Sequence, residues 1–172
     1  PMIIGTHNGY ALSFKSSVVR SMGRSAAGVR GIRLRDEDYV IGAAPLNPDS
    51  KVLVISENGF GKQTPASEYP IKGRGGLGVK TVNVTAKNGP LVGLTTVNGD
   101  EDIMLVTDQG VIIRFDIESV SQTGRSAVGV HLIKMDNGAR VATIAKVDKE
   151  VDEETEEATN NSSQEESQPT EN

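Results

Sequence analysis

Three arginines recur at nearly regular spacing in glycine-rich segments of this chain. Arg24, Arg74 and Arg125 are 50 and 51 residues apart, and each directly follows a glycine. A guanidinium group can donate two parallel hydrogen bonds to a phosphate, and nearby glycines let the backbone approach an anion closely. A curved row of such groups suits a bent nucleic-acid duplex. The alternative is structural, with each arginine fixing its turn to carbonyl or carboxylate groups of a neighbouring repeat.

Lysines and glycines near these arginines extend the candidate anion-binding surface. Phosphate contact should be largely independent of base sequence, because nothing in the chain resembles a recognition helix. A simple role as solvated surface competes with this interpretation at every lysine and at Arg33. We expect the contacts to come from Arg24, Arg74, Arg125, Lys72, Gly75, Gly76, Lys80 and Arg33.

Other groups that could do chemistry give weaker signals. His7 and His131 are single histidines without the spacing of metal ligands. The acidic runs 36–38 and 100–102 could bind magnesium, but they fall in loops and read better as turn residues. Residues 73–78 are not a Walker motif, because no Gly-Lys-Ser/Thr follows them. We therefore predict no catalytic residue, no metal site and no cofactor in this chain.

The elements that position the arginines form three repeated units. Each unit opens with a tight turn, at Asn8 and Gly9, at Asn58 and Gly59, and at Gln109 and Gly110. Asn-Gly between apolar alternating runs favours a β-hairpin, because both residues tolerate positive φ. We expect first strands at 2–6, 51–56 and 102–107, second strands at 10–14, 60–64 and 111–115, third strands at 29–34, 79–85 and 130–135, and fourth strands at 39–44, 90–97 and 140–147.

This pattern predicts an all-β fold of about three propeller-like blades, each with four antiparallel strands. We name them unit 1 (residues 1–50), unit 2 (51–100) and unit 3 (101–147). Three blades are too few to close comfortably around an axis, so we expect the chain to be part of a larger array. Residues 148–172 contain ten acidic residues and one lysine, and we expect a disordered tail.

Charge is divided between these two parts. Residues 1–147 carry 17 Lys and Arg against 13 Asp and Glu, although the net charge of the whole chain is −5. A basic body suits a polyanionic partner, and the acidic tail either competes for that surface or only adds solubility. The chain has no cysteine, which excludes disulfides, and no apolar run near the ~20 residues needed to span a bilayer.

Four segments, 23–34, 68–81, 102–115 and 124–133, resemble the C-terminal domain of the A subunits of bacterial DNA gyrase and topoisomerase IV. The resemblance implies a β-pinwheel, in which neighbouring blades exchange strands and a basic rim wraps duplex DNA. It also implies a cytoplasmic, nucleoid-associated parent enzyme: an ATP-dependent type II topoisomerase that introduces negative supercoils. Its partners would be further blades of the same polypeptide and two B subunits in an A2B2 tetramer. ATP, magnesium and the catalytic tyrosine would lie outside this chain.

One departure keeps alternatives open. The gyrase signature is Gln-Arg-Arg-Gly-Gly-Arg/Lys-Gly, and residues 72–78 retain only Arg74, Gly75, Gly76 and Gly78 of it. Gly73 and Leu77 stand where basic residues are expected. Topoisomerase IV therefore remains the alternative to gyrase. From another class, the repeats could form a propeller-like scaffold for protein interactions, and an enzymatic propeller is the third possibility.

Overall fold

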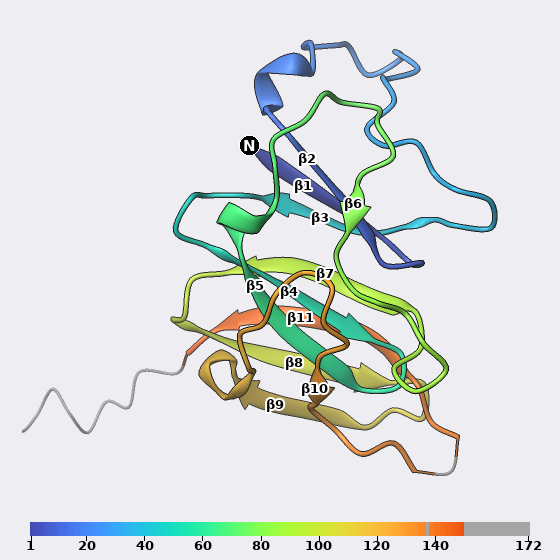
Figure 1. The fold of residues 1–172 in the computed structure, drawn as a ribbon, viewed down its shortest axis with the longest axis vertical. Helices are drawn as coiled ribbons and strands as arrows, with labels where there is room; N and C mark the ends of the chain where they lie inside the picture. Colours follow the sequence, from blue (N-terminus) through green and yellow to red (C-terminus); the bar gives the residue numbers. More distant parts are fainter. Residues whose placement is uncertain (137, 150–172) are drawn as a thin grey trace, which may run out of the picture.

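The computed structural model describes residues 1–136 and 138–149, and Figure 1 shows them as three stacked β-sheets. The elements in this part of the chain are β-strands and three short 3-10 turns. Unit 1 contributes β1 (Met2–Thr6), β2 (Tyr10–Phe14), η1 (Ser16–Val18) and β3 (Val40–Pro45). Unit 2 contributes β4 (Lys51–Ser56), β5 (Phe60–Pro65), η2 (Ala66–Glu68), β6 (Val79–Lys80) and β7 (Leu91–Val97). Unit 3 contributes β8 (Glu101–Thr107), β9 (Ile112–Asp116), η3 (Ile117–Ser119), β10 (Val130–His131) and β11 (Val141–Asp148).

The predicted hairpins are confirmed in all three units. β1 pairs with β2, β4 with β5 and β8 with β9, each antiparallel. The turn glycines Gly9, Gly59 and Gly110 have φ values of 87°, 82° and 81°, a conformation that glycine adopts without steric cost. The predicted fourth strands are also confirmed, because β3, β7 and β11 pair with the first strand of their own unit.

The predicted third strands are wrong in length. Only two residues of each form a strand, in β6 and β10, and residues 29–34 form none. The reason is the pairing partner, since β6 joins β2 of unit 1 and β10 joins β5 of unit 2. The third segments of units 2 and 3 therefore cross to the preceding unit and meet its sheet edge over a short stretch. The sheets have the orders β3-β1-β2-β6, β10-β5-β4-β7 and β11-β8-β9.

The core lies between the sheets, and β4 has both of its faces buried in it. Val52 and Val54 pack in a cluster with residues of unit 1, which includes Ile3. Leu53 and Ile55 point to the opposite face and pack with residues of unit 3. Alternate side chains of a strand point to opposite faces of the sheet, so a strand buried on both sides reads as a continuous apolar run. The run Val-Leu-Val-Ile thus places unit 2 between its neighbours.

Two glycines with the same φ test whether the exchanged segment approaches its neighbour so closely that it excludes a side chain. Gly78 and Gly138 both have a φ of 73°, but a Cβ at Gly78 would lie 2.6 Å from the carbonyl oxygen of Ala11, whereas a Cβ at Gly138 would meet nothing within 4 Å. We expect Gly138→Ala to lower the free energy of unfolding by about 1 to 2 kcal/mol, the cost of positive φ. Gly78→Ala should cost clearly more in urea unfolding. Equal losses would contradict the close approach of the exchanged segment.

Candidate nucleic-acid interface

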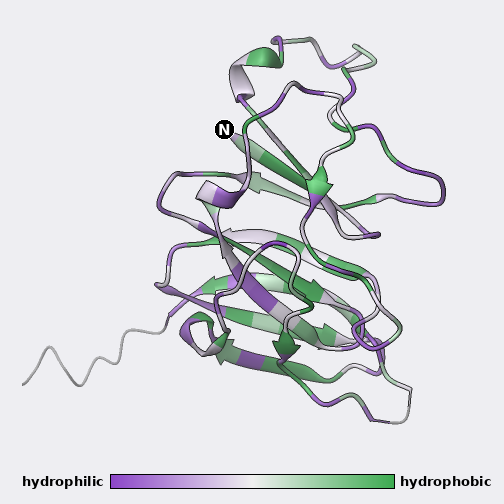
Figure 2. Ribbon diagram, in the orientation of Figure 1, coloured by the Kyte–Doolittle hydropathy of each residue, from purple (hydrophilic) through white to green (hydrophobic). Residues whose placement is uncertain are grey.

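The connection that carries Arg125 is anchored by polar residues of β5. Lys62, Gln63 and Thr64 are polar, yet all three are buried, because β5 lies in the middle of the fold. Figure 2 shows this hydrophilic stretch within β5. The side-chain amide of Gln63 donates to the carbonyls of Ile117 (2.7 Å) and Val120 (2.8 Å). Because an unpaired buried polar group is costly, these bonds fix the path of the unit 3 connection.

Lys62 holds the turn that contains the third repeat arginine. Its side chain is fully buried, and its Nζ donates to the carbonyls of Gly124 (2.6 Å) and Arg125 (2.5 Å). Burial lowers the pKa of the Lys62 ammonium to about 8, which the carboxylate of Glu68 partly opposes and the Arg125 guanidinium reinforces. The buried ammonium, which donates to two carbonyls of this turn, locks the Gly-Arg turn onto unit 2.

Two of the three repeat arginines hold one unit to another. The Arg74 Nη1 donates to the carbonyl of Arg30 at 2.6 Å, and the Arg125 Nη1 donates to the carbonyl of Lys80 at 3.0 Å. Arg30 and Lys80 occupy equivalent positions, 50 residues apart. The structural role considered for these arginines is therefore present at Arg74 and Arg125. Arg24 is exposed and has no hydrogen-bond partner among the described residues.

The predicted site residues gather in two places. The connection with Lys72, Arg74, Gly75 and Gly76 lies against the one with Arg33, which donates its backbone N–H to the carbonyl of Gly76 at 2.8 Å. The backbone N–H of Gly75 donates to the carbonyl of Gly31 at 2.7 Å, so it is already paired in this structure, and its contact with phosphate stays a prediction. Lys80 and Arg125 meet at β6, as described above. Arg33, Lys72 and Lys80 are exposed, as an anion-binding side chain requires.

A basic hollow lies beside β5 and β10. It is lined by Asn58, Phe60, Lys87, His131, Lys134, Met135, Gly138, Ala139 and Arg140. The Lys87 ammonium lies 5.6 Å from the centre of the Phe60 ring, and His131 packs edge-on against the same ring. Lys87 and Arg140 were missed because they come from separate loops, and no local sequence pattern shows that these loops meet.

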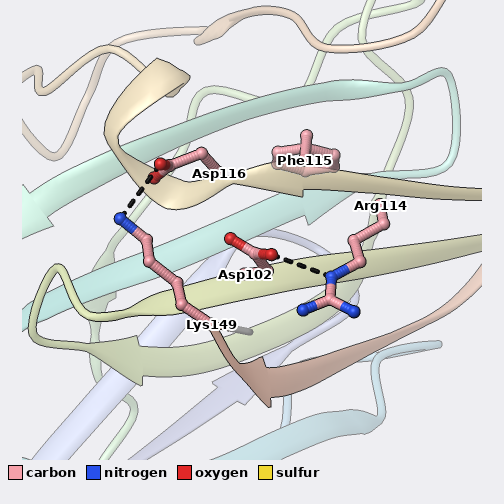
Figure 3. A pocket seen from close by; sticks show the side chains of 5 residues that line it. All are labelled: Asp102, Arg114, Phe115, Asp116 and Lys149. Carbon is pink, nitrogen blue, oxygen red and sulfur yellow. Dashed lines mark hydrogen bonds and ion pairs between the residues drawn. The ribbon is translucent and has the colours of Figure 1, made fainter. Parts of the chain in front are cut away.

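A second cleft, at the ends of β8 and β9, is a poorer anion site. Figure 3 shows Arg114 pointing toward Asp102 and Lys149 pointing toward Asp116. The Arg114 Nε lies 2.8 Å from an Asp102 oxygen, and the Lys149 Nζ lies 2.9 Å from an Asp116 oxygen. Each cation already has a carboxylate beside it, so a phosphate would have to compete with that partner.

The acidic run 100–102 serves the fold, as the sequence suggested. The buried Glu101 carboxylate accepts the backbone N–H groups of Asn98 and Gly99. Burial acts to raise the pKa of Glu101, but these hydrogen bonds and the Lys146 ammonium outweigh it, and the pKa lies below its usual value.

In residues 1–136 and 138–149, no group of three or more His, Cys, Asp or Glu side chains could hold a metal ion. No helix in the same residues is long and apolar enough to cross a membrane.

Known proteins resemble this chain in sequence and in structure. A family model described as DNA gyrase C-terminal domain, beta-propeller, matches residues 2–47, 50–98 and 101–148. The gyrase A protein of Staphylococcus epidermidis is 49% identical over 151 residues, which are 87% of this chain and 17% of that protein. The gyrase A protein of Staphylococcus aureus is 46% identical over the same coverage. The chain thus spans less than a fifth of the length of these relatives.

Two solved structures share the fold. The structure of a DNA gyrase A C-terminal domain superposes with a TM-score of 0.79 at 28% identity, covering 85% of this chain and 50% of that one. The C-terminal domain of a DNA topoisomerase IV superposes with a TM-score of 0.82 at 25% identity, covering 95% of this chain and 51% of that one.

The buried ammonium of Lys62 should give this protein a characteristic pH dependence. Because its pKa is lower in the folded chain than in the unfolded one, the unfolded state binds more protons between pH 8 and 10.5. The Lys62 contribution to stability therefore rises through this window, by about 3 kcal/mol at about 1.4 kcal/mol per pKa unit. Urea unfolding of Lys62→Met across pH should lack this rise, whereas the exposed-site variant Lys72→Met should keep it. Parallel profiles for all three proteins would refute a desolvated Lys62.

The repeat arginines should differ in their effect on stability. Arg125→Ala removes the hydrogen bond to the carbonyl of Lys80 and should lower the free energy of unfolding by about 1 kcal/mol. Arg24→Ala changes the same residue type in the same motif without losing such a bond, and should stay within about 0.5 kcal/mol of the unmodified protein. Urea denaturation measures both. A larger loss for Arg24→Ala would contradict the assignment.

Proposed function

We propose that this chain, which belongs to the DNA gyrase C-terminal domain family, is a DNA-binding and DNA-wrapping part of a gyrase A protein. The observation that carries the proposal is a row of exposed residues at equivalent places in the third segments of the three units. Arg30, Lys80 and His131 are 50 and 51 residues apart, and all three are exposed. The repeat supplies one such residue per unit, so the row follows the direction in which the sheets stack.

The exposed cations, more than the repeat arginines, are suited to phosphate contact. Arg33, Lys72 and Lys80 project from the connections that Arg74 and Arg125 hold in place. Because the backbone beneath each cation is already fixed, a phosphate contact has to order only the side chain. Each neutralised phosphate also releases counterions. The surface should therefore bind duplex DNA without reading base sequence. Bending the duplex costs elastic energy, which a larger number of phosphate contacts must offset.

We infer that the parent enzyme is an ATP-dependent type II topoisomerase of the bacterial cytoplasm and nucleoid, an isomerase that introduces negative supercoils. The identity of 46–49% to the gyrase A proteins of two Staphylococcus species supports this parent. ATP, magnesium and the residues that cut DNA would lie in the rest of an A2B2 complex with gyrase B. This chain would supply no catalytic group, and its partners would be duplex DNA and further gyrase A blades.

Topoisomerase IV is the second candidate for the parent enzyme. The structural match to its C-terminal domain covers 95% of this chain, and the gyrase signature is degenerate at residues 72–78. Gyrase is favoured because the 46–49% identity to gyrase A proteins is higher than the 25% identity to that topoisomerase IV structure.

Fluorescence anisotropy of a labelled duplex across a salt titration tests the proposal on the full chain. Affinity should fall steeply with salt, with a slope of roughly −0.9 per phosphate neutralised. Lys80→Gln and Arg33→Gln should each weaken binding and make the slope shallower by about one unit. Lys51→Gln, which removes a charge from a half-buried position on β4, should leave binding unchanged. Salt-insensitive binding, or none, would contradict a phosphate-contacting surface.

A further inference from the structure

The basic hollow beside β5 and β10 is built around the ring of Phe60. His131 pairs with Phe60 across the two strands, and the two rings meet edge-on with their centres 3.9 Å apart. Lys87 comes from the loop before β7, and its ammonium lies 5.6 Å from the centre of the Phe60 ring. The aromatic ring therefore has one basic side chain beside it from β10 and another from this loop.

The place where β6 joins β2 has the same arrangement, with a permanent charge in place of the histidine. Lys80 pairs with Tyr10, and the guanidinium carbon of Arg35 lies 3.4 Å from the centre of the Tyr10 ring. Lys80 precedes His131 by 51 residues, at the equivalent position. Lysine and arginine keep their charge at neutral pH, whereas a histidine changes its charge between about pH 5 and 8. In the row of Arg30, Lys80 and His131, the unit 3 member is thus the one whose charge depends on pH.

The charged groups that line the hollow with His131 are cations. They are Lys87, Lys134 and Arg140, and no acidic residue is among the described residues that form its wall. Arg140 has a carboxylate nearby, because its Nε lies 3.8 Å from a Glu57 oxygen. Lys87 and Lys134 have no carboxylate partner in the part of the chain that the structure describes. Such a set of donors favours an anion, and an anion held there favours a protonated imidazole.

The hollow is open to a phosphate group without rearrangement of the chain. Lys87, His131 and Lys134 are exposed, whereas the Phe60 ring between them is only 4% exposed. Strand pairing fixes the backbone of His131, and the buried ring positions its imidazole. This imidazole has no hydrogen-bond partner among the described residues, so no internal hydrogen bond has to break before it contacts an anion.

We propose that this hollow binds one phosphate group, and that His131 takes up a proton from solvent when it does so. The imidazolium then donates an N–H to a phosphate oxygen, beside the ammonium groups of Lys87 and Lys134. A phosphodiester of duplex DNA and a free phosphate ion present the same kind of oxygen. The first source rests on the proposed function, and it makes the hold of unit 3 on a duplex stronger as the pH falls.

Anisotropy of a labelled duplex, in salt titrations of the full chain at two pH values, tests the proton uptake. The slope of log affinity against log salt should be steeper by about one unit at about pH 5.5 than at about pH 8, because one more phosphate contact is made by a cation. His131→Lys should give the steeper slope at both pH values, and His131→Gln the shallower slope at both. His7→Gln changes the other histidine of the chain and should keep the difference.

The two His131 variants also identify a pH effect that comes from other groups. A difference in slope that survives in His131→Gln would overturn the proposal, as would equal slopes at the two pH values in the unmodified protein. Either result would leave the proposed function intact, because the duplex would still bind in a salt-dependent way.

Proton NMR of the two imidazoles distinguishes the sources of the phosphate, with His7→Gln assigning the signals. The pH midpoint of the His131 signal should move upward when the duplex is added. The same movement with inorganic phosphate alone would show a site for any phosphate group, whereas a response to the duplex alone would show a site for DNA phosphodiesters. A His131 signal that responds to neither would refute the site. Should the duplex not bind at all, the proposed function fails, and inorganic phosphate alone still decides whether the hollow takes up an anion and a proton.

Discussion

The pairing of each sheet edge by a segment of the next unit is the constraint on which the rest of the structure depends. A strand edge has a row of backbone donors and acceptors that need partners. β6 and β10 supply these partners to β2 and β5 over only two residues each. The approach is so close that glycine is required on both sides, as at Gly9 and Gly78, which face the carbonyls of Val82 and Ala11. The recurrence of glycine at these positions of the two junctions reflects this contact.

At the two junctions, where β6 joins β2 and β10 joins β5, different side chains hold the connection that leads to the exchanged strand. In the first, the Ser13 hydroxyl donates to the carbonyl of Pro70 at 2.9 Å. In the second, the amide of Gln63 and the ammonium of Lys62 perform this task, with two carbonyl partners each. The arginine that follows is common to both junctions and binds a carbonyl of the exchanged segment. The motif therefore orders the connection, and the cations beside it face solvent.

Sequence periodicity was sufficient for the elements whose partners belong to the same unit. The hairpins followed from alternation and turn chemistry, because their two strands lie close in sequence. The fourth strands followed from their apolar runs, although their partners in the same unit are distant in sequence, as in the pair of Met2 with Pro45. The strand lengths predicted for the third segments were wrong, since these lengths depend on the sheet edge of another unit. The partner of Arg74 was not predicted for the same reason, because Arg30 belongs to another unit and is 44 residues away in sequence. The predicted acidic tail, 148–172, begins too early, because Asp148 is the last residue of β11, and its residues 150–172 lie outside the described residues.

The first two sheets each receive a strand from the unit that follows, and none receives one from the unit before. The two ends of the stack are therefore not equivalent. Removal of unit 1 would leave the second and third sheets with all of their strands, whereas removal of unit 3 would strip β10 from the second sheet. Local opening at the two ends is therefore unequal in cost. In a nearest-neighbour array, this inequality sets the order in which cooperative segments exchange their amide hydrogens. Local opening that begins in unit 3 removes β10 from the second sheet and so spreads to unit 2. The stability of unit 2 against local opening therefore depends on that of unit 3.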